Sequence, residues 1–519
     1  MLEQTPLLSN IDDEHYNGVL SETVGVDNAF QAAQRDTKYS SVSSRYVLQL
    51  CVLMLIFNFT QYAAYAPLTA VFEDIICTHY YSSNFHHLPL SQRDCKVIPV
   101  QYELALVKGY KDAFSQIPSI FLSIPLGLLA DRIGRKPVIL LFLLGIFLND
   151  TWVKVVCIFP SQLPLRLVWF GPVLKAVGGG ANFGTSMLFT AVADVTREKD
   201  RVPAFLKLSA MEMVVQIAGA PLVSTLMSFN NWYPLGLSSI LLVVAGLIAI
   251  LLPETHPQPR GTILVSPSTV YGQASISGHN EGVQLADSYF QMFKKVVLRS
   301  YTTSGDLLKN PGILLSLAVF LLAAWGAHSW ALLLQYVSQK FKWEFSTANL
   351  LFSLRCGITL LLSLLIIGAI DRFVQQKLGI KSAQKDLLLS MGSCILIIVG
   401  VTVVGLAQSS ILMVAGVVIS ALGSSLLVSF RCAMIALFPQ TPVASLNAVT
   451  AIAESFGILI SGPVLAAIYS WGLSQGGIWT GAPFLLASGL HILALAIIFY
   501  LRLTRTPVQV SALLERQGS

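Results

Sequence analysis

Long runs of apolar residues, separated by short polar turns, dominate this 519-residue chain. A helix needs about 20 apolar residues to cross about 30 Å of hydrocarbon, and runs of this length recur about twelve times here. Only 12% of the residues are charged, whereas a soluble domain carries about 25%. Because lipid offers no partner to backbone polar groups, such runs must be helical. The sequence therefore predicts an all-α membrane protein.

The predicted spans form two sets of six around one long polar loop. The spans cover residues 46–68, 109–130, 137–158, 168–193, 204–228, 233–252, 312–336, 347–370, 387–407, 410–436, 444–470 and 483–503. The domain prediction is a disordered tail over 1–45, bundles over 46–252 and 312–503, a central loop over 253–311 and a carboxyl-terminal tail over 504–519. An even number of crossings places both tails on one side.

Lysine and arginine in the short loops predict the orientation. One set of loops contains Arg132, Arg135, Lys136, Arg197, Lys199, Arg201, Lys207, Arg372, Lys377, Lys381 and Lys385. The opposite set contains Arg93, Lys96, Arg166, Lys340 and Lys342. Positive charge accumulates in cytosolic loops, so the first set, both tails and the central loop are predicted to be cytosolic.

The two sets of spans also repeat internally. Span 204–228 contains Glu212 followed by Pro221, and span 444–470 contains Glu454 followed by Pro463, each 242 residues after its counterpart. A charged residue and a helix-bending residue at one offset indicate two related six-helix units.

A charged turn after the second span reads Gly127-Leu-Leu-Ala-Asp131-Arg132-Ile-Gly134-Arg135-Lys136. It matches the Gly-x3-Asp-Arg-x-Gly-Arg-Lys signature of the major facilitator superfamily, which the chain resembles over nearly its whole length. Within it, the chain looks most like fungal multidrug or secondary-metabolite transporters. The resemblance implies two pseudo-symmetric six-helix bundles around a cavity. It also implies that this turn latches the bundles in the outward-facing state; the alternative is a turn that only sets topology. The predicted gating residues are Gly127, Asp131, Arg132, Gly134, Arg135 and Lys136.

Ionisable residues inside a membrane are costly and usually functional. Glu212 and Glu454 lie well inside their spans, where loss of water favours the neutral carboxyl. Either is a candidate proton carrier, and so is His328, which lies between two tryptophans. The alternatives are a structural carboxyl bonded to a neighbour such as Arg431 or Arg355, and a histidine that is simply packed.

Other polar and aromatic residues are candidates for the cavity wall. The first span carries a stripe of such residues, and the resemblance places spans 1, 4, 7 and 10 around the cavity. Isolated cations in later spans need a carboxylate or water. The alternative for the stripe is helix packing. The predicted cavity residues are Asn58, Gln61, Tyr62, Tyr65, Lys175, Trp325, Arg355 and Arg431.

Several kinds of chemistry have no support in the sequence. There is no glycine-rich phosphate loop, no metal-ligand spacing among the seven cysteines and no dense basic tract for nucleic acid. We therefore predict that the protein is not an enzyme and uses no cofactor or metal. The predicted energy source for its function is a gradient across the membrane. Cys77 and Cys95 share one outer loop, where they form either a disulfide or two free thiols.

These expectations combine into one functional hypothesis. The chain is predicted to be a secondary transporter of small organic molecules that exports a drug or secondary metabolite by proton antiport. Proton-coupled uptake of a nutrient and a non-transporting sensor are the alternatives. The predicted partners are a small-molecule substrate, the bilayer and protons, with the chain as a monomer. The plasma membrane is the expected location. The vacuolar membrane is the alternative, because Leu7-Leu8 resembles a dileucine sorting signal.

Overall fold

The computed structural model describes residues 11–84, 93–196, 201–254, 309–362, 382–439, 441 and 443–517. Within these ranges every regular element is helical. The loop that carries Arg372, Lys377 and Lys381, most of the central loop and the dileucine pair lie outside the described residues. The all-α prediction is confirmed for the part of the chain that is described.

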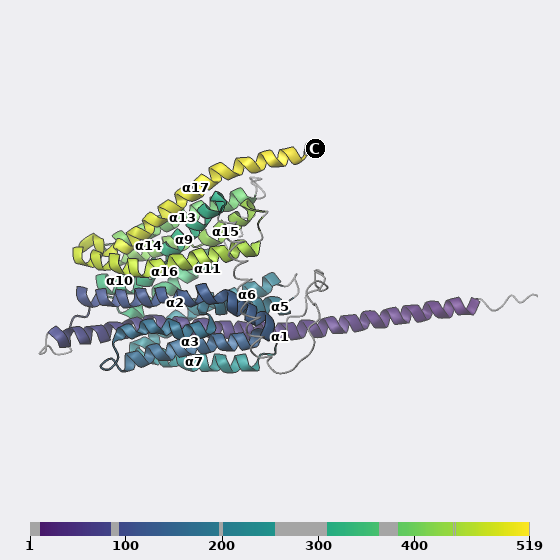
Figure 1. Cartoon of the computed structure of the whole chain (residues 1–519), viewed down its shortest axis with the longest axis horizontal. Coiled ribbons are helices and arrows are strands. Elements are labelled where there is room, and N and C mark those ends of the chain that lie inside the picture. Colours follow the sequence, from purple (N-terminus) through teal and green to yellow (C-terminus); the bar gives the residue numbers. More distant parts are fainter. Residues whose placement is uncertain are drawn as a thin grey trace, which may run out of the picture.

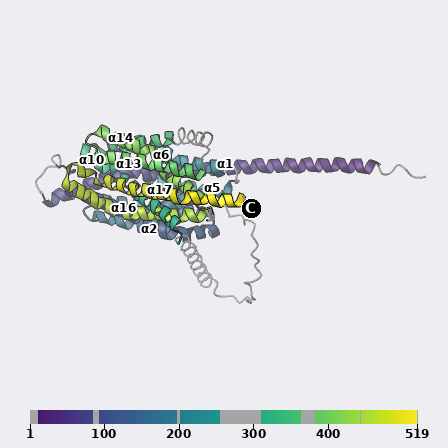
Figure 2. The same ribbon diagram turned by 90° about the horizontal axis from the view of Figure 1, so that it is seen from above.

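The helices form two bundles that lie one above the other (Figure 1). The amino-terminal bundle contains α1 (Ile11–Asn84), α2 (Ile98–Ile133), α3 (Arg135–Ile158), α4 (Gly171–Lys175), α5 (Ala181–Val195), α6 (Arg201–Phe229) and α7 (Trp232–Leu251). The carboxyl-terminal bundle contains α9 (Pro311–His328), α10 (Leu333–Phe341), α11 (Phe345–Leu361), α13 (Ser382–Leu406), α14 (Ser410–Leu422), α15 (Leu426–Leu437), α16 (Val443–Gln475) and α17 (Ala482–Gln517). The start of α1 and the end of α17 lie at the same end of the molecule in both views (Figures 1 and 2), as the orientation argument predicts.

Among the described residues, nine helices are long and apolar enough to cross a membrane. A tenth, within α2, bends by 50° at Pro125, because a proline inside a helix removes a hydrogen bond and clashes with the preceding turn. Two predicted spans fall short. Helix α11 has its expected cytosolic part outside the described residues, and span 168–193 is interrupted at Gly179 and Gly180, both with positive φ.

The structure corrects two predicted boundaries. Helix α1 begins at Ile11, so the stretch 11–45, expected to be disordered, continues the first span as one helix that projects beyond the bundles (Figure 1). No proline interrupts the sequence between Pro6 and Pro67, so nothing there forces the helix to end. Helix α2 begins at Ile98 rather than at residue 109, because its polar first turns are stabilised by contacts that a hydropathy window does not count.

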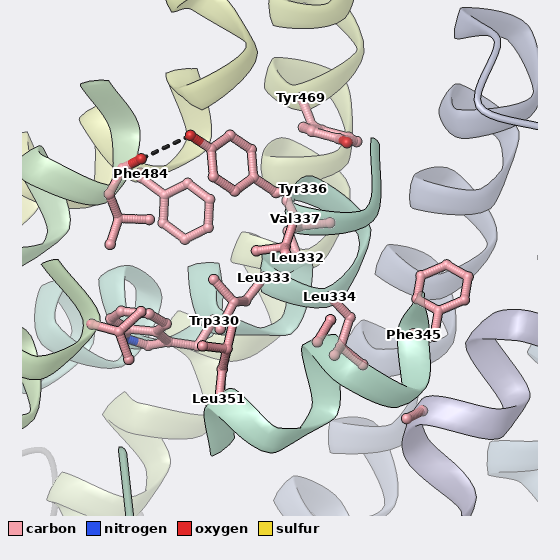
Figure 3. Packing of buried hydrophobic residues seen from close by; sticks show 14 of the residues in the cluster. Trp330, Leu332, Leu333, Leu334, Tyr336, Val337, Phe345, Leu351, Tyr469 and Phe484 are labelled. Atoms are coloured by element: carbon pink, nitrogen blue, oxygen red, sulfur yellow. Dashed lines mark hydrogen bonds between the residues drawn. The ribbon is translucent and has the colours of Figure 1, made fainter. Parts of the chain in front are cut away.

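The buried apolar residues show how the bundles meet. One core, at the outer end, combines Ala66 and Met227 of the first bundle with Trp330, Tyr336 and other residues of the second (Figure 3). The cytosolic halves have separate cores, one drawn from the first bundle and one from the second. Since apolar burial drives association, the bundles are joined outside and separate inside. The structure is therefore inward-facing.

Candidate functional site

A cavity of about 250 Å³ lies against two helices of the first bundle. Its wall comes from α1 and α6, which each present one face to it. The lining residues are Asn58, Gln61, Tyr62, Tyr65, Glu212, Val215 and Gln216. Four of them form the polar-aromatic stripe predicted for the first span, so the structure brings that stripe together with the predicted carboxyl of span 204–228.

Glu212 is exposed where it faces this cavity. Its one described hydrogen bond comes from Gln216 Nε2, 3.4 Å from Glu212 Oε1 and one helical turn away. Among the described residues no cation lies within ion-pair distance of this carboxylate. Glu212 therefore faces the cavity without an ion-pair partner among the described residues.

Tyr62 and Tyr65 line the cavity and also link the two bundles. The Tyr62 hydroxyl donates to Asn349 Oδ1 at 3.1 Å, and the Tyr65 hydroxyl donates to the Ala331 carbonyl at 2.8 Å. Asn349 in turn donates to the Ala220 carbonyl at 3.2 Å. These two tyrosines therefore line the pocket and also make hydrogen bonds between helices of the two bundles.

Two glycines bring the bundles into backbone contact on the outer side of this cavity. Gly109 of α2 and Gly462 of α16 face each other, and a Cβ added to Gly109 would lie 2.5 Å from the Gly462 carbonyl oxygen. Small residues allow this approach of helices in membranes. The contact depends on the absence of both side chains and holds the outer ends together.

A polar cluster secures the same outer end. Lys96 pairs with Glu73 at 2.7 Å and lies 4.3 Å from the ring centroid of Phe345 in the other bundle. Gln101 donates to Glu73 at 2.5 Å, and Gln335 of α10 donates to the Gln101 carbonyl at 2.6 Å. We call Glu73, Lys96, Gln101, Gln335 and Phe345 the outer gate cluster. The sequence analysis missed it because Glu73 lies beyond the predicted end of the first span.

A disulfide joins the two predicted cysteines beside this cluster. Cys77 at the outer end of α1 is bonded to Cys95, and the Cys95 carbonyl accepts from Gln101 Nε2 at 2.9 Å. Of the two alternatives drawn from the sequence, the structure has the disulfide. It fixes the segment that carries Lys96 against α1.

The charged turn forms contacts only within its own bundle among the described residues. Arg135 pairs with Asp131 at 2.7 Å and with Asp194 of α5 at 2.8 Å. The Lys136 amide donates to Glu254 Oε1 at 3.4 Å. The side chain of Asp131 is 57% exposed, and its ion-pair partner among the described residues is Arg135 of the same bundle.

Two glycines of the turn differ in what they do. Gly134 adopts φ 98°, and the Glu254 carboxylate lies where its Cβ would be, so a side chain is excluded on both grounds. At Gly127, by contrast, a Cβ would meet no described atom within 4 Å, so this glycine makes no close helix contact in this conformation. With the bundles apart on the cytosolic side, no neighbour is near Gly127. The side chain of Arg132 lies outside the described part.

Glu454 has a different environment from Glu212. Its Oε1 accepts from Arg431 Nη2 at 2.6 Å, which joins α16 to α15 within the second bundle. This is the structural alternative foreseen for the carboxyl. The internal repeat in sequence therefore does not extend to the environment of the two glutamates.

Lys175 and Arg355 have no carboxylate partner in the described part of the chain. Lys175 ends α4 and is 9% exposed. Arg355 of α11 places its guanidinium carbon 4.8 Å from the centroid of the Trp330 ring. Trp325, which was predicted to line the cavity, is partly buried and packs against the outer core. The contact with Arg355 is made by Trp330 instead.

His328 faces the first bundle. Together with Lys108 and Asp112 of α2 it lines a space of about 10 Å³, about the size of one water molecule. Lys108 is 6% exposed and lies 4.9 Å from the Tyr65 ring centroid. The predicted second span begins only at residue 109, whereas α2 begins at Ile98 and so carries both Lys108 and Asp112 within the helix.

A buried ion pair in α3 was also missed. Lys154 contacts Asp150 at 2.5 Å and donates to the Leu235 carbonyl of α7 at 2.7 Å and to Ser238 Oγ at 2.9 Å. Both charged residues lie on one face because they are four residues apart. That spacing was visible in the sequence and could have indicated the pair. The network ties α3 to α7 and does not reach the cavity.

Charge pairing also acts at the outer surface. Arg166 forms two hydrogen bonds with Glu103, at 2.9 and 3.0 Å, and this raises the pKa of Arg166. The pair links the loop before α4 to α2 and lies far from the charged turn.

Comparison with known proteins supports this architecture. Residues 107–383 match the family model described as Major Facilitator Superfamily. The efflux pump ustT of Aspergillus flavus is 32% identical over 420 residues, which cover 79% of each chain. The MFS efflux pump atnC of Emericella nidulans is 31% identical over 464 residues, or 87% of each chain. A crystal structure of a D-xylose–proton symporter is similar in fold, with a TM-score of 0.58 and 12% identity over 87% of this chain and 97% of that one.

Proposed function

Because the chain belongs to the major facilitator superfamily, we propose that this transporter exports a small organic molecule from the cytosol by proton antiport. The observation that carries the proposal is Glu212, exposed in a cavity lined by α1 and α6, in a structure whose two bundles share a core at their outer ends. The names of two similar proteins, both efflux pumps, support the outward direction. We place the protein in the plasma membrane as a monomer.

The proposed cycle uses the two ends of the molecule in turn. Cargo enters the cavity of the inward-facing state from the cytosol. The outer gate cluster and the Gly109–Gly462 contact then separate, while the cytosolic ends come together. In that second state the charged turn, through the exposed Asp131, would contact the other bundle and hold the cytosolic side closed.

Glu212 supplies the coupling in this proposal. Its carboxyl takes up a proton when the cavity opens to the acidic outside, and releases that proton when the cavity opens to the cytosol. No cation is paired with Glu212 among the described residues. In this proposal its protonation therefore depends on the local pH and on how much water surrounds the carboxyl. Loss of water favours its neutral form whenever the cavity closes.

The test is transport in cells and then in vesicles. Yeast that lack their own drug exporters and express the protein would be loaded with rhodamine 6G, cycloheximide or fusidate, which are cationic, neutral and anionic. We expect lower accumulation of at least one compound, and pH-gradient-driven uptake of that compound into inverted vesicles. Higher accumulation would indicate an importer. No flux of any compound under either gradient would indicate a sensor and overturn the proposal.

A further inference from the structure

Arg355 is a charged group in the membrane interior whose hydrogen-bonding capacity is unused. Its guanidinium lies on the face of Trp330, 4.8 Å from the ring centroid, and forms no ion pair or hydrogen bond with any described residue. An arginine stacked on an aromatic face keeps its N–H groups free at the edge. Those donors point to a ligand that this chain does not itself provide.

The other charges inside the bundles show how unusual this is. Lys111, Lys154 and Arg431 each lie within ion-pair distance of a carboxylate, on Asp112, Asp150 and Glu454 respectively. Arg355 has no such carboxylate among the described residues. An unpaired charge in a low-dielectric interior is costly, and an anionic ligand would reduce that cost.

The surroundings of Arg355 suit an apolar body attached to the anionic group. One turn away on α11, Phe352 packs edge-on against Tyr65, with ring centroids 6.0 Å apart. Tyr65 lines the 250 Å³ cavity. Trp330 is held in place by Phe484, 6.0 Å between centroids, within the outer core (Figure 3). Aromatic rings therefore extend from the guanidinium to the cavity.

Resting on the proposed transport function, we propose that the cargo is an organic anion with an aromatic or apolar body, whose oxyanion binds Arg355. A carboxylate accepts two parallel hydrogen bonds from a guanidinium, which gives both strength and orientation. The apolar body then lies along Trp330 and Tyr65. Export of an anion moves negative charge outward, so the inside-negative membrane potential favours it in addition to the pH gradient.

The test compares two probes of the same shape. Tritiated 1-naphthaleneacetate and 1-naphthaleneacetamide differ only in charge, and their equilibrium binding to the full-length protein in nanodiscs needs no gradient. We expect the wild type to bind the acid at least about tenfold more tightly than the amide. Arg355→Gln should remove this preference by weakening the acid alone, and Arg355→Lys should keep part of it. Arg166→Gln, at the outer surface, is the matched control and should keep all of it.

Two results would overturn the inference: wild type that binds both probes equally or binds neither, and a preference for the acid that survives in Arg355→Gln. If Arg355→Gln does not fold, the ratio of the wild-type affinities for the acid and the amide, together with that ratio in Arg355→Lys, still tests the inference. Because no gradient is imposed, the result is independent of the direction and coupling of transport. A protein that prefers the acid yet moves nothing in vesicles would refute only the proposed function.

Discussion

Arg431 Nη2 lies 2.6 Å from Glu454 Oε1, an ion pair between α15 and α16. Glu212, the counterpart of Glu454 in the first half, has no such partner in the described chain and faces the cavity instead. Two carboxyls at equivalent positions of a repeat therefore have different environments. Glu454 forms an ion pair between two helices, and Glu212 has no ion-pair partner among the described residues.

This difference predicts opposite outcomes for two matched substitutions. Glu212→Gln should abolish flux driven by a pH gradient while leaving gradient-free exchange of cargo, because a neutral side chain retains the cavity but carries no proton. Glu454→Gln should keep gradient-driven flux. It should lower stability by about 1–3 kcal/mol, because Arg431 loses a charged hydrogen-bond acceptor. Flux in reconstituted vesicles and thermal unfolding in one detergent would measure the two effects. Full gradient-driven flux in Glu212→Gln would contradict the assignment.

The backbone contact between Gly109 and Gly462 should control the equilibrium between the two states. Gly462→Ala places a methyl group against the Gly109 carbonyl, so the outer ends should separate and the outward-facing population should rise. Distances between spin labels at the outer ends of α2 and α16, in a Cys432→Ser background, would report this shift. Gly489→Ala is the control, because a Cβ there meets no described atom within 4 Å. Equal distance distributions in the two variants would refute the gating role of the contact.

The Lys154–Asp150 pair should contribute to stability rather than to transport. Lys154→Met leaves Asp150 buried without its cation, and we expect a loss of about 3–5 kcal/mol. Adding Asp150→Asn should recover part of this loss, since no uncompensated charge remains. Unfolding of both single variants and the double variant completes the cycle. Additive losses would show that the two residues do not interact.

The Cys77–Cys95 bond should stabilise the outer gate. It closes a loop of 18 residues, for which the entropy of the unfolded chain predicts about 3 kcal/mol. The Cys77→Ser, Cys95→Ser double variant should unfold at a lower temperature than the wild type, and a reducing agent should lower the wild type to the same value. The double variant itself should not respond to the reducing agent. Alkylation of both thiols in unreduced wild type would show that the bond is absent.

Some features followed directly from the sequence. The membrane spans, the orientation and the family rest on local signals: apolar run length, loop charge and the Gly127–Lys136 turn. Four residues from Asn58 to Tyr65 were predicted to form one stripe, and all four line the same pocket, because a three-residue spacing places side chains near one face of any helix. Signals of this kind can be predicted because they depend only on residues that are close together in the sequence.

Partners across the fold could not be predicted in the same way. The sequence offered Arg431 or Arg355 as the neighbour of a glutamate, and only the packing of α15 on α16 selected Arg431 and left Arg355 on Trp330. Local hydropathy by itself determined that this chain crosses a membrane in two related halves. Tertiary packing decided which of the described charges have an ion-pair partner and which do not, because ion pairs depend on distances between helices that are far apart in sequence.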